Sequence, residues 1–372
     1  MAVPLPEVHS LAECVSFPQT VMPFVSEFLA LPTRLLEAGQ DVDTLKEVYF
    51  TTNPFVTAIA FALLLCPLFL VTSEIFRNWS QVDRVWSILP AVYNVHFAVW
   101  ARATGISSQR LDTIALVTIL WSLRLTFNYW RKGGYQWGSE DYRWQIIRSK
   151  INNGFLFFLL NVVFICVVQS LLLALITAPT YVFLVVSQVH GHEEFGIPDL
   201  VFSRLMFFFI VIELLADQQQ WSFQRAKGEY LKTARIPDRY KGRYTQEDLD
   251  RGFVVSGLWS WCRHPNFAAE QAIWLTLYIW SCYITQTYVN WTGIGVLGYL
   301  LIFQGSTPLT ESISAAKYPE YVEYQARVGR FIPRLSVEAK GSHVAEGSKK
   351  KNKSTLSEVD QAEQTAEGKK TN

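Results

Sequence analysis

The chain has 372 residues, of which half are hydrophobic and only 17% are charged, and its formal net charge at pH 7 is +1. Soluble domains usually carry about 25% charged residues, so this composition disfavours an ordinary soluble protein. A net charge this small also argues against nucleic acid as a partner, because there is no surplus of basic side chains to neutralise phosphates. The five cysteines lie far apart and predict neither a disulfide framework nor a zinc site.

Long apolar runs predict an all-α fold, a polytopic membrane helix bundle of about seven spans. A spanning helix needs about 20 mostly apolar residues, because its backbone must satisfy its own hydrogen bonds in lipid. In chain order the predicted spans are 54–71, 85–101, 113–130, 155–175 with a half-helix at 181–186 after Pro179, 200–215, 270–284 and 294–304. In the last span Gly293, Gly295 and Gly298 spell GxGxxG, but no strand precedes them, so we interpret them as a site of close helix packing.

The distribution of lysine and arginine predicts the orientation of these spans. The loops 131–150 and 223–251 are basic and fall on one side of a seven-span arrangement, together with the C-terminus, whereas 190–199 contains no Lys or Arg. Basic loops mark the cytosolic side, so the C-terminus is expected in the cytosol. We expect an N-terminal segment at 1–50, a membrane domain at 51–336 and a disordered cytosolic tail at 337–372.

The last four residues of the chain, KKTN, predict its location. Lys369 and Lys370 stand three and four places from the C-terminus, which is the spacing of the dilysine signal that returns membrane proteins to the endoplasmic reticulum. The alternative is a chance pair in a lysine-rich tail. We therefore expect a multi-pass protein of the endoplasmic reticulum membrane.

The most informative motif is GLWSWCRHPNFAAE, at 257–270, where a charged loop enters the sixth predicted span. Arg263 and His264 offer hydrogen-bond donors suited to phosphate oxygens. Asn266 and Glu270 are four residues apart, so they share one face of the helix. An ionisable group in an apolar run is costly and usually faces a polar cavity. The alternative is an interfacial cap in which Arg263 contacts lipid phosphates.

A second polar cluster follows the fifth predicted span. Glu213 and Asp217 are one helical turn apart, and Arg225 and Lys227 come after them on the cytosolic side. Acidic groups inside and basic groups outside would suit a ligand with a phosphate end and a polar ring. The alternative is a belt of side chains that extend to the membrane interface.

Two further groups of polar residues are candidates for a catalytic or a metal-binding role. Asp83 and Tyr129 lie at the same membrane face as the basic loops, at the start of the second predicted span and the end of the third. The loop side chains His190, His192, Glu193 and Glu194 could bind a metal, but they are predicted on the opposite face from the other clusters. No metal site is therefore expected.

Three runs of the sequence resemble the DUF1295 family of the steroid 5-alpha-reductase-like group. They are ELLADQQQWSF at 213–223, GLWSWCRHPNFAAE at 257–270 and STPLTESISAAKYPEYVEYQARVGRFIP at 306–333, and the similarity covers roughly 50–335. The resemblance implies a membrane fold similar to steroid 5-alpha reductases and isoprenylcysteine methyltransferases. It also implies an NADPH site on the cytosolic side of the helices.

The resemblance assigns cofactor roles to particular residues. The group's Asn and Glu, four apart, match Asn266 and Glu270, its Asp and Arg after a span resemble Asp217 and Arg225, and its C-terminal tyrosines resemble Tyr318 and Tyr324. The group's RHPNYFGE form has Tyr and Gly where this chain has Phe267 and Ala269. Loss of the tyrosine hydroxyl removes a hydrogen bond, and Ala in place of Gly narrows a close approach.

These observations together predict a membrane reductase that transfers a hydride from NADPH to a polarised carbon–carbon double bond of a sterol or other lipid enone. Arg263, His264 and Arg225 would hold phosphates, and Asn266, Asp217 and Glu270 would position the nicotinamide and ribose. Asp83 and Tyr129 are the candidates for the acid that stabilises a developing enolate. The alternatives are a methyltransferase that uses S-adenosylmethionine and a non-catalytic lipid-binding membrane protein.

Overall fold

The computed structural model describes residues 4–106, 108–191 and 194–333. These residues are helical and contain no strand; an isolated parallel bridge joins Cys262 to Gly329. The prediction of an all-α fold is confirmed. The predicted tail at 337–372, with Lys369 and Lys370, lies outside the described residues.

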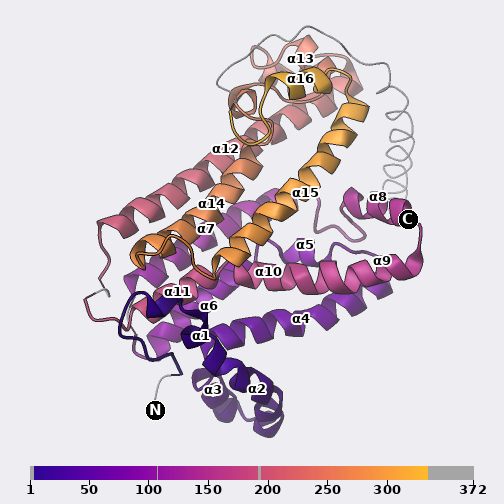
Figure 1. The fold of residues 1–372 in the computed structure, drawn as a ribbon. Coiled ribbons are helices and arrows are strands. Elements are labelled where there is room, and N and C mark those ends of the chain that lie inside the picture. Colours follow the sequence, from indigo (N-terminus) through magenta and orange to yellow (C-terminus); the bar gives the residue numbers. More distant parts are fainter. Residues whose placement is uncertain (1–3, 107, 192–193, 334–372) are drawn as a thin grey trace. The chain divides into compact units, whose positions relative to one another are not determined.

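The helices of the described chain are shown as coiled ribbons in Figure 1. Up to residue 131 they are η1 (Glu13–Val15), α1 (Phe17–Thr20), η2 (Met22–Phe24), α2 (Val25–Ala38), α3 (Val42–Phe50), α4 (Pro54–Phe76), α5 (Gln81–Val85), α6 (Leu89–Ala103) and α7 (Gln109–Arg131). They continue with α8 (Tyr142–Ile151), α9 (Gly154–Leu160), the π-helix η3 (Asn161–Val168), α10 (Gln169–Leu175), α11 (Ala178–Val186) and α12 (Ile197–Thr233). The last are η4 (Asp238–Tyr240), α13 (Gln246–Arg251), η5 (Gly257–Ser260), α14 (Pro265–Ile284), α15 (Gly293–Lys317) and α16 (Tyr321–Arg327).

The chain forms two compact units. Unit 1 comprises Met1–Trp144, Arg148–Phe207 and Ile273–Leu301, and unit 2 comprises Gln145–Ile147, Phe208–Ala272 and Ile302–Asn372. The predicted N-terminal segment, 1–50, belongs to unit 1, and its described part contains the helices η1 to α3.

Each predicted span falls largely within a helix of the structure. The half-helix predicted after Pro179 is α11, and Pro179 stands in its first turn, where a missing backbone N–H costs nothing. One boundary was wrong. The second predicted span was to begin at residue 85, but Val85 ends α5, and α6 begins only at Leu89. Pro90 in the first turn of α6 explains the restart, because proline fits a helix start better than a helix interior.

Within the described ranges, two helical segments are long and apolar enough to cross a membrane, Pro54–Phe76 and Gly154–Val186. The first is α4, whose 23 residues extend roughly 34 Å at 1.5 Å per residue, against about 30 Å for a hydrocarbon core. The second is the run from α9 to α11. α4 lies beside η3 and α10 in unit 1 (Figure 1).

Local sequence explains where α4 begins and which faces it presents. The Asn53 side chain accepts hydrogen bonds from the N–H groups of residues 55 and 56, and Pro54 occupies the first turn. One face of α4 buries small and apolar side chains, whereas Leu64, Leu68 and Val71 are exposed on its other face. A helix that is apolar on all sides is typical of a membrane span or a deep core.

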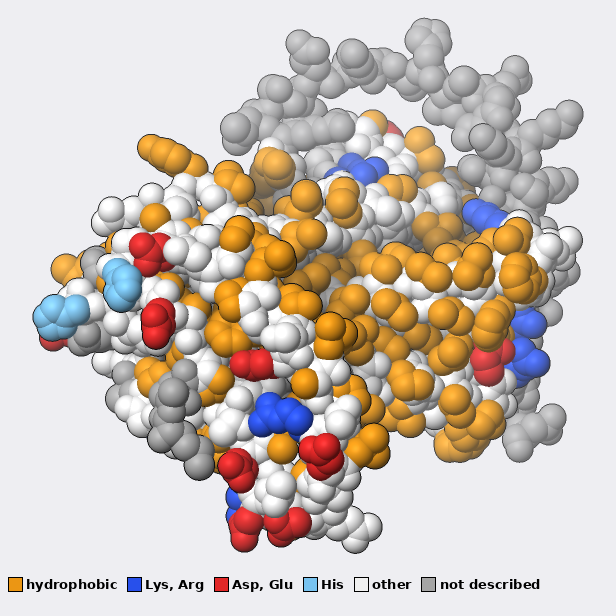
Figure 2. Space-filling view, turned by 60° about the horizontal axis from the view of Figure 1, so that its bottom comes forward, with side chains coloured by type: hydrophobic (Ala, Val, Ile, Leu, Met, Phe, Trp, Pro, Cys, Tyr) orange, Lys and Arg blue, Asp and Glu red, His pale blue; other side chains and the backbone are white. Residues whose placement is uncertain are grey.

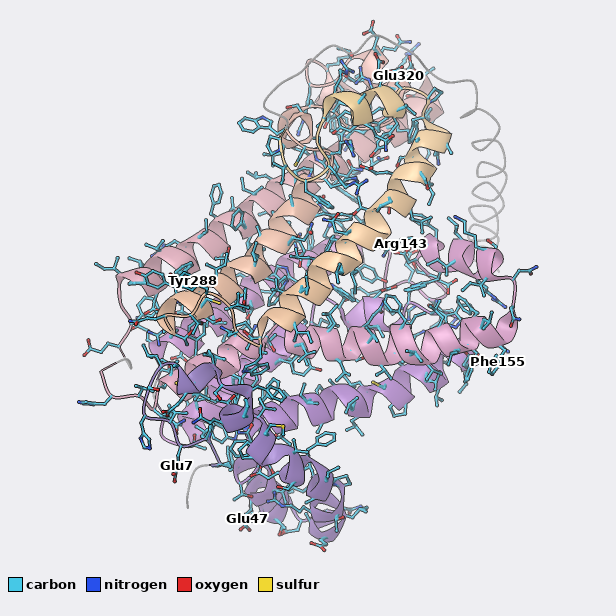
Figure 3. All side chains as sticks on the ribbon, viewed as in Figure 1. Glu7, Glu47, Arg143, Phe155, Tyr288 and Glu320 are labelled. Carbon is cyan, nitrogen blue, oxygen red and sulfur yellow. The ribbon has the colours of Figure 1, made fainter. Side chains whose placement is uncertain are left out.

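Exposed apolar side chains also cover the neighbouring helix of unit 1. Phe155, Leu156 and Val163, on α9 and η3, are exposed. Figure 2 shows the hydrophobic side chains crowded over this part of unit 1, where α4 and the α9–η3 segment lie. Figure 3 labels Phe155 at the beginning of α9, with its ring pointing away from the helix. Contiguous apolar surface of this kind marks a contact with lipid or protein.

The glycines near the start of α15 allow close packing inside unit 1, as predicted. A Cβ atom at Gly295 would lie 2.2 Å from the backbone oxygen of Leu175 in α10, and a Cβ at Gly298 would lie 2.9 Å from Leu172 Cδ1. Glycine at position 295 therefore allows a helix backbone to approach another backbone directly.

We expect Gly295→Ala to destabilise the protein by about 1–3 kcal/mol, the usual cost of overpacking, even though alanine is the better helix former. Gly305→Ala, on the same helix, is the matched control, because nothing lies within 4 Å of a Cβ at that position. Thermal unfolding of detergent-purified protein measures both. Equal midpoints for the two variants would show that Gly295 is not a packing contact.

Candidate functional site

The polar site of unit 2 is assembled where the RHPN motif meets the C-terminal GRFIP segment. The Arg263 N–H donates to Gly329 O at 2.8 Å, and the His264 N–H donates to Arg330 O at 3.1 Å. Pro265 then begins α14, as its sequence position indicates. Two motifs that are more than sixty residues apart in the chain are thus joined by their backbones.

Glu311, on α15, is the carboxylate on which this region converges. Arg263 donates to both of its oxygens, from Nε to Oε1 at 2.6 Å and from Nη2 to Oε2 at 3.1 Å. His264 Nε2 lies 2.9 Å from Oε1, and Gln325 Nε2 donates to Oε2 at 3.2 Å. Arg330 Nε lies 3.5 Å from Oε2. Paired Arg–carboxylate bonds of this kind are among the strongest that side chains make.

The surroundings of Glu311 keep it ionised. Only 2% of the residue is exposed. Burial by itself would raise the pKa of this carboxyl, but hydrogen bonds from His264 and Arg263, together with their charges, lower its pKa from 4.5 to about 2. The charge is buried but fully compensated, which is the condition under which a buried ion pair is tolerated.

All three guanidinium nitrogens of Arg263 donate to protein acceptors. Besides Glu311, its Nη1 donates to Gln325 O at 3.0 Å and also to Val328 O. The predicted phosphate contacts of Arg263 and His264 are therefore not prepared in this arrangement, since a phosphate would have to displace Glu311. The geometry gives these two residues the role of fixing the first turn of α14.

Asp217 and Asn266, which were each predicted to position the cofactor, lie in hydrogen-bond contact. Asn266 Nδ2 donates to Asp217 Oδ1 at 3.2 Å, which joins α12 to α14 within unit 2. One turn further toward the apolar part of each helix stand Glu213 and Glu270, and both are buried. The Oδ1 atom of Asn266 is screened from solvent but has no hydrogen-bond partner among the described residues. A buried acceptor in this state is ready for a donor group on a ligand.

A second pair lies ten residues further along α12. Lys227 Nζ donates to Tyr318 Oη at 2.7 Å and to Gly252 O at 2.9 Å. Gly252 has φ +85°, and a Cβ there would lie 2.5 Å from the Tyr318 ring, so glycine is needed for both reasons. Ten residues of helix correspond to about 15 Å. Arg225, two residues before Lys227, is exposed.

Tyr324 has a different position from Tyr318. Its hydroxyl donates to the backbone oxygen of Trp259, and its ring packs with Phe253 and Tyr321 in a buried aromatic cluster. Only 4% of Tyr324 is exposed. The structure thus places it in the core of unit 2, and its role in cofactor binding stays a prediction.

Asp83 and Tyr129 belong to unit 1, where they are electrostatic neighbours. Asp83 accepts a hydrogen bond from Trp144 Nε1 at 2.9 Å. Burial, together with the charge of Asp141, raises the pKa of Asp83 despite the opposing charge of Arg143. Figure 3 labels Arg143 near the start of α8, and its Nη2 donates to Asp141 Oδ2 at 2.7 Å. A carboxyl with a raised pKa is a reasonable proton donor.

Sequence reasoning did not single out Glu311 or the bond between Lys227 and Tyr318. Glu311 lies within the quoted run 306–333, and a lone acid in a small, apolar helix stretch is the signal that could have drawn attention to it. Its partners His264 and Arg263 could not be named, because they lie 47 and 48 residues away along the chain. Of the loop side chains weighed as metal ligands, His192 and Glu193 lie outside the described residues.

The fold and site define a class: an all-helical protein with membrane-length apolar segments and buried polar pairs near the start of one helix. The chain belongs to the family described as "Protein of unknown function (DUF1295)", whose sequence pattern matches residues 68–328. It is 39% identical over 344 residues to "Uncharacterized protein C594.04c" of Schizosaccharomyces pombe, an alignment that covers 92% of this chain and 96% of the relative. No solved structure matches the chain.

We expect Glu311→Gln to destabilise unit 2 by about 3–5 kcal/mol at pH 7, because it leaves the buried charge of Arg263 uncompensated. Because the pKa of Glu311 is lower in the folded state, its contribution is complete above pH 4.5 and is lost as the pH falls toward 2. The variant should therefore show a weaker loss of stability between pH 5 and pH 2 than the parent protein.

Glu320→Gln is the control for this substitution. Glu320 is exposed and lies 3.3 Å from Arg251, and an ion pair at the surface contributes less than about 1 kcal/mol. Chemical unfolding across this pH range compares the three proteins. If both variants had the same stability and the same acid dependence, Glu311 would not be the centre of this region.

Proposed function

We propose that this protein is a multi-span membrane reductase that transfers a hydride from NADPH to a polarised carbon–carbon double bond of a sterol or other lipid enone. The proposal rests on the polar pairs of unit 2, on the apolar surfaces of the helices and on the resemblance of the motifs to the steroid 5-alpha-reductase-like group. One observation carries it furthest: the pair of Asp217 and Asn266, with the unpartnered Asn266 Oδ1.

Two segments qualify as membrane spans by length and composition alone. Exposed apolar side chains on further helices support the seven spans that we propose. Leu116 and Leu123 are exposed on α7, and Leu297 and Leu301 on α15. Large apolar side chains on the outer faces of several helices are stable in hydrocarbon but costly in water. α6 has only 15 residues, fewer than a straight helix needs to cross the hydrocarbon core. The segments on either side of α6 would complete the crossing.

The cofactor proposal follows from the chemistry of the groups present. A nicotinamide carries a carboxamide whose N–H groups need an acceptor, and Asn266 Oδ1 is a buried acceptor that lacks a donor. Asp217 holds the Asn266 side chain in place. Glu270, one turn further along α14, is the group we propose for a ribose hydroxyl.

The cationic groups on α12 fit the phosphate end of the same ligand. Lys227 is an ammonium, and the Tyr318 hydroxyl that accepts from it keeps its own hydrogen to donate. Arg225 is exposed nearby on the same helix. The roughly 15 Å of α12 between the two pairs suits an extended dinucleotide, whose ring and phosphates need separate contacts. Phosphate binding by Arg263 and His264 is the weaker form of the proposal, since both are engaged by Glu311.

When bound, NADPH supplies the hydride, and the chain supplies position and charge. Asp217 and Asn266 would orient the carboxamide, and Lys227, Tyr318 and Arg225 would neutralise phosphate charge. A proton must reach the substrate oxygen or carbon as negative charge develops there. We assign this proton to Asp83, whose pKa is raised by burial and by the charge of Asp141, with Tyr129 as its electrostatic neighbour in unit 1.

Removing the proposed contacts should weaken nucleotide binding by roughly ten- to a hundredfold, which corresponds to the about 1.5–3 kcal/mol of a hydrogen bond to a charged group. We expect Arg225→Ala to reduce affinity for NADPH more than for NADH. Asn266→Ala should reduce affinity for both nucleotides. Lys232→Ala is the matched control, because Lys232 is exposed on α12, two helical turns after Arg225.

The measurement is fluorescence titration of detergent-purified protein with NADPH, NADH and S-adenosylmethionine. Tight binding of S-adenosylmethionine with no response to either nucleotide would refute the proposal in favour of a methyltransferase. A lower thermal midpoint for Asn266→Ala with unchanged nucleotide affinity would show that this residue only caps α14.

We further propose that the protein resides in the endoplasmic reticulum membrane with its C-terminus in the cytosol. In sealed microsomes, a tag placed after Asn372 should be removed by added protease without detergent. Replacing Lys369 and Lys370 by Ser should move part of the protein to later compartments, whereas the same change at Lys349 and Lys350 should not. Complete protection of the tag would reverse the orientation and place the basic loops in the lumen.

A further inference from the structure

The short helix α2, outside the predicted spans, exposes a stripe of apolar side chains. Val25, Leu29, Pro32 and Leu36 are exposed, and Met22 in η2 extends the row. Their spacings of three, four, three and four residues place them on one face of a helix. Leu29 is 71% exposed and Leu36 81%. A helix surrounded by water would bury these apolar side chains, but α2 presents them outward.

Two charged side chains of α2, those of Glu27 and Arg34, are turned the other way. Glu27 Oε2 accepts a hydrogen bond from the Asn53 N–H at 2.9 Å. Arg34 donates to Thr52 Oγ1 at 3.0 Å and to Thr51 Oγ1 at 2.6 Å. These bonds fix α2 against the residues that lead into α4. They also show that the outward direction of the apolar stripe is imposed by specific contacts.

A third face of α2 completes its attachment to unit 1. Leu31 and Ala38 are buried and pack with Val48 of α3, and Leu45 and Ala60 pack against this cluster. The apolar stripe is thus separate from the face that α2 uses for packing. Figure 1 shows α2 and α3 together at one end of unit 1.

Next to the apolar stripe runs an exposed row of different character. Ser26, Thr33 and Glu37, each one residue after a member of the stripe, are exposed as well, and the small side chain of Ala30 lies between Ser26 and Thr33. Neighbouring residues on a helix point about 100° apart, so α2 presents one apolar and one polar face outward. A helix with these two faces is typical of the boundary between lipid and water.

The anchoring residues fix the level at which α2 lies. Asn53 is the N-cap of α4, so it marks the N-terminal end of this apolar helix. Its polar side chain needs hydrogen bonds, which lipid does not supply. α3, which packs beside α2, exposes Asp43, Lys46 and Glu47; Figure 3 labels Glu47 at the far end of this part of unit 1. The helix pair therefore combines a charged side with the apolar stripe.

We propose that α2 lies in the membrane surface at the N-terminal end of α4, with its apolar stripe among the acyl chains below the headgroups. The inference rests on the membrane placement proposed above and is independent of the reaction. Exposed acids outnumber exposed bases on the α2–α3 pair, with Glu37, Asp41, Asp43 and Glu47 against Lys46. This charge disfavours a second copy of the same surface and favours zwitterionic lipid over anionic lipid.

Spin labels on single cysteines test the proposal in phosphatidylcholine nanodiscs. The labels replace Leu29 and Leu36 on the stripe, Thr33 and Glu37 on the adjacent polar row, and Leu64 and Leu68 on the exposed face of α4. The five native cysteines are buried, so the parent protein should take up little label. Collision with dissolved oxygen, which concentrates in lipid, is compared with collision with a water-soluble nickel chelate.

We expect labels at positions 29 and 36 to meet oxygen several-fold more often, relative to nickel, than labels at 33 and 37. Labels at 64 and 68 should favour oxygen most. Labels at 29 and 36 that meet nickel as often as those at 33 and 37, with lipid exposure kept at 64 and 68, would overturn the α2 proposal and leave the membrane placement intact. Nickel access at all six positions would overturn both. Dipolar coupling between two copies labelled at 36 would identify a second copy as the occupant and would also contradict the proposal.

Discussion

The buried carboxylate of Glu311 holds together the chain segments from which the polar region of unit 2 is built. Arg263 and His264 reach it from the start of α14, Gln325 from α16 and Arg330 from the segment that follows. Each of these groups would be expensive to bury alone, and together they compensate one another. The first turn of α14 is fixed in this way, and with it the position of Asn266 against Asp217.

The contacts of Glu311 divide the residues of the RHPN motif between two roles. Its Arg and His bind Glu311, and the Oδ1 atom of its Asn is a buried acceptor with no hydrogen-bond partner in the part of the chain that the structure describes. The Lys227–Tyr318 pair adds cationic character further along α12. In the function that we propose, this difference in roles favours a site for a long, anionic cofactor over a lipid-binding protein without chemistry. S-adenosylmethionine, with a single carboxylate, would need fewer cationic groups.

The sequence predicted those features that depend on neighbouring residues or on periodicity. The start of α14 at Pro265, the half-helix α11 and the glycine contact of α15 follow from local rules of this kind. The restart of the helix at Leu89 was missed because the span was predicted from its apolar run alone, although Pro90 is a local signal for a helix start. Glu311 was missed because its partners come from distant parts of the chain. Likewise, the outward stripe of α2 is visible only once Glu27 and Arg34 are seen to point inward.

We propose that the protein transfers a hydride from NADPH to a lipid enone, and isotope transfer is the most direct test of this reaction. Membranes that contain the protein would be incubated with NADPH carrying deuterium at C4 of the nicotinamide, in parallel with methyl-labelled S-adenosylmethionine. Lipid products would then be analysed by mass spectrometry. We expect deuterium on the carbon that was the β-carbon of the enone, and loss of this label in membranes with the Asn266→Ala variant. A labelled methyl group on lipid, with no deuterium in any lipid fraction, would contradict this proposal.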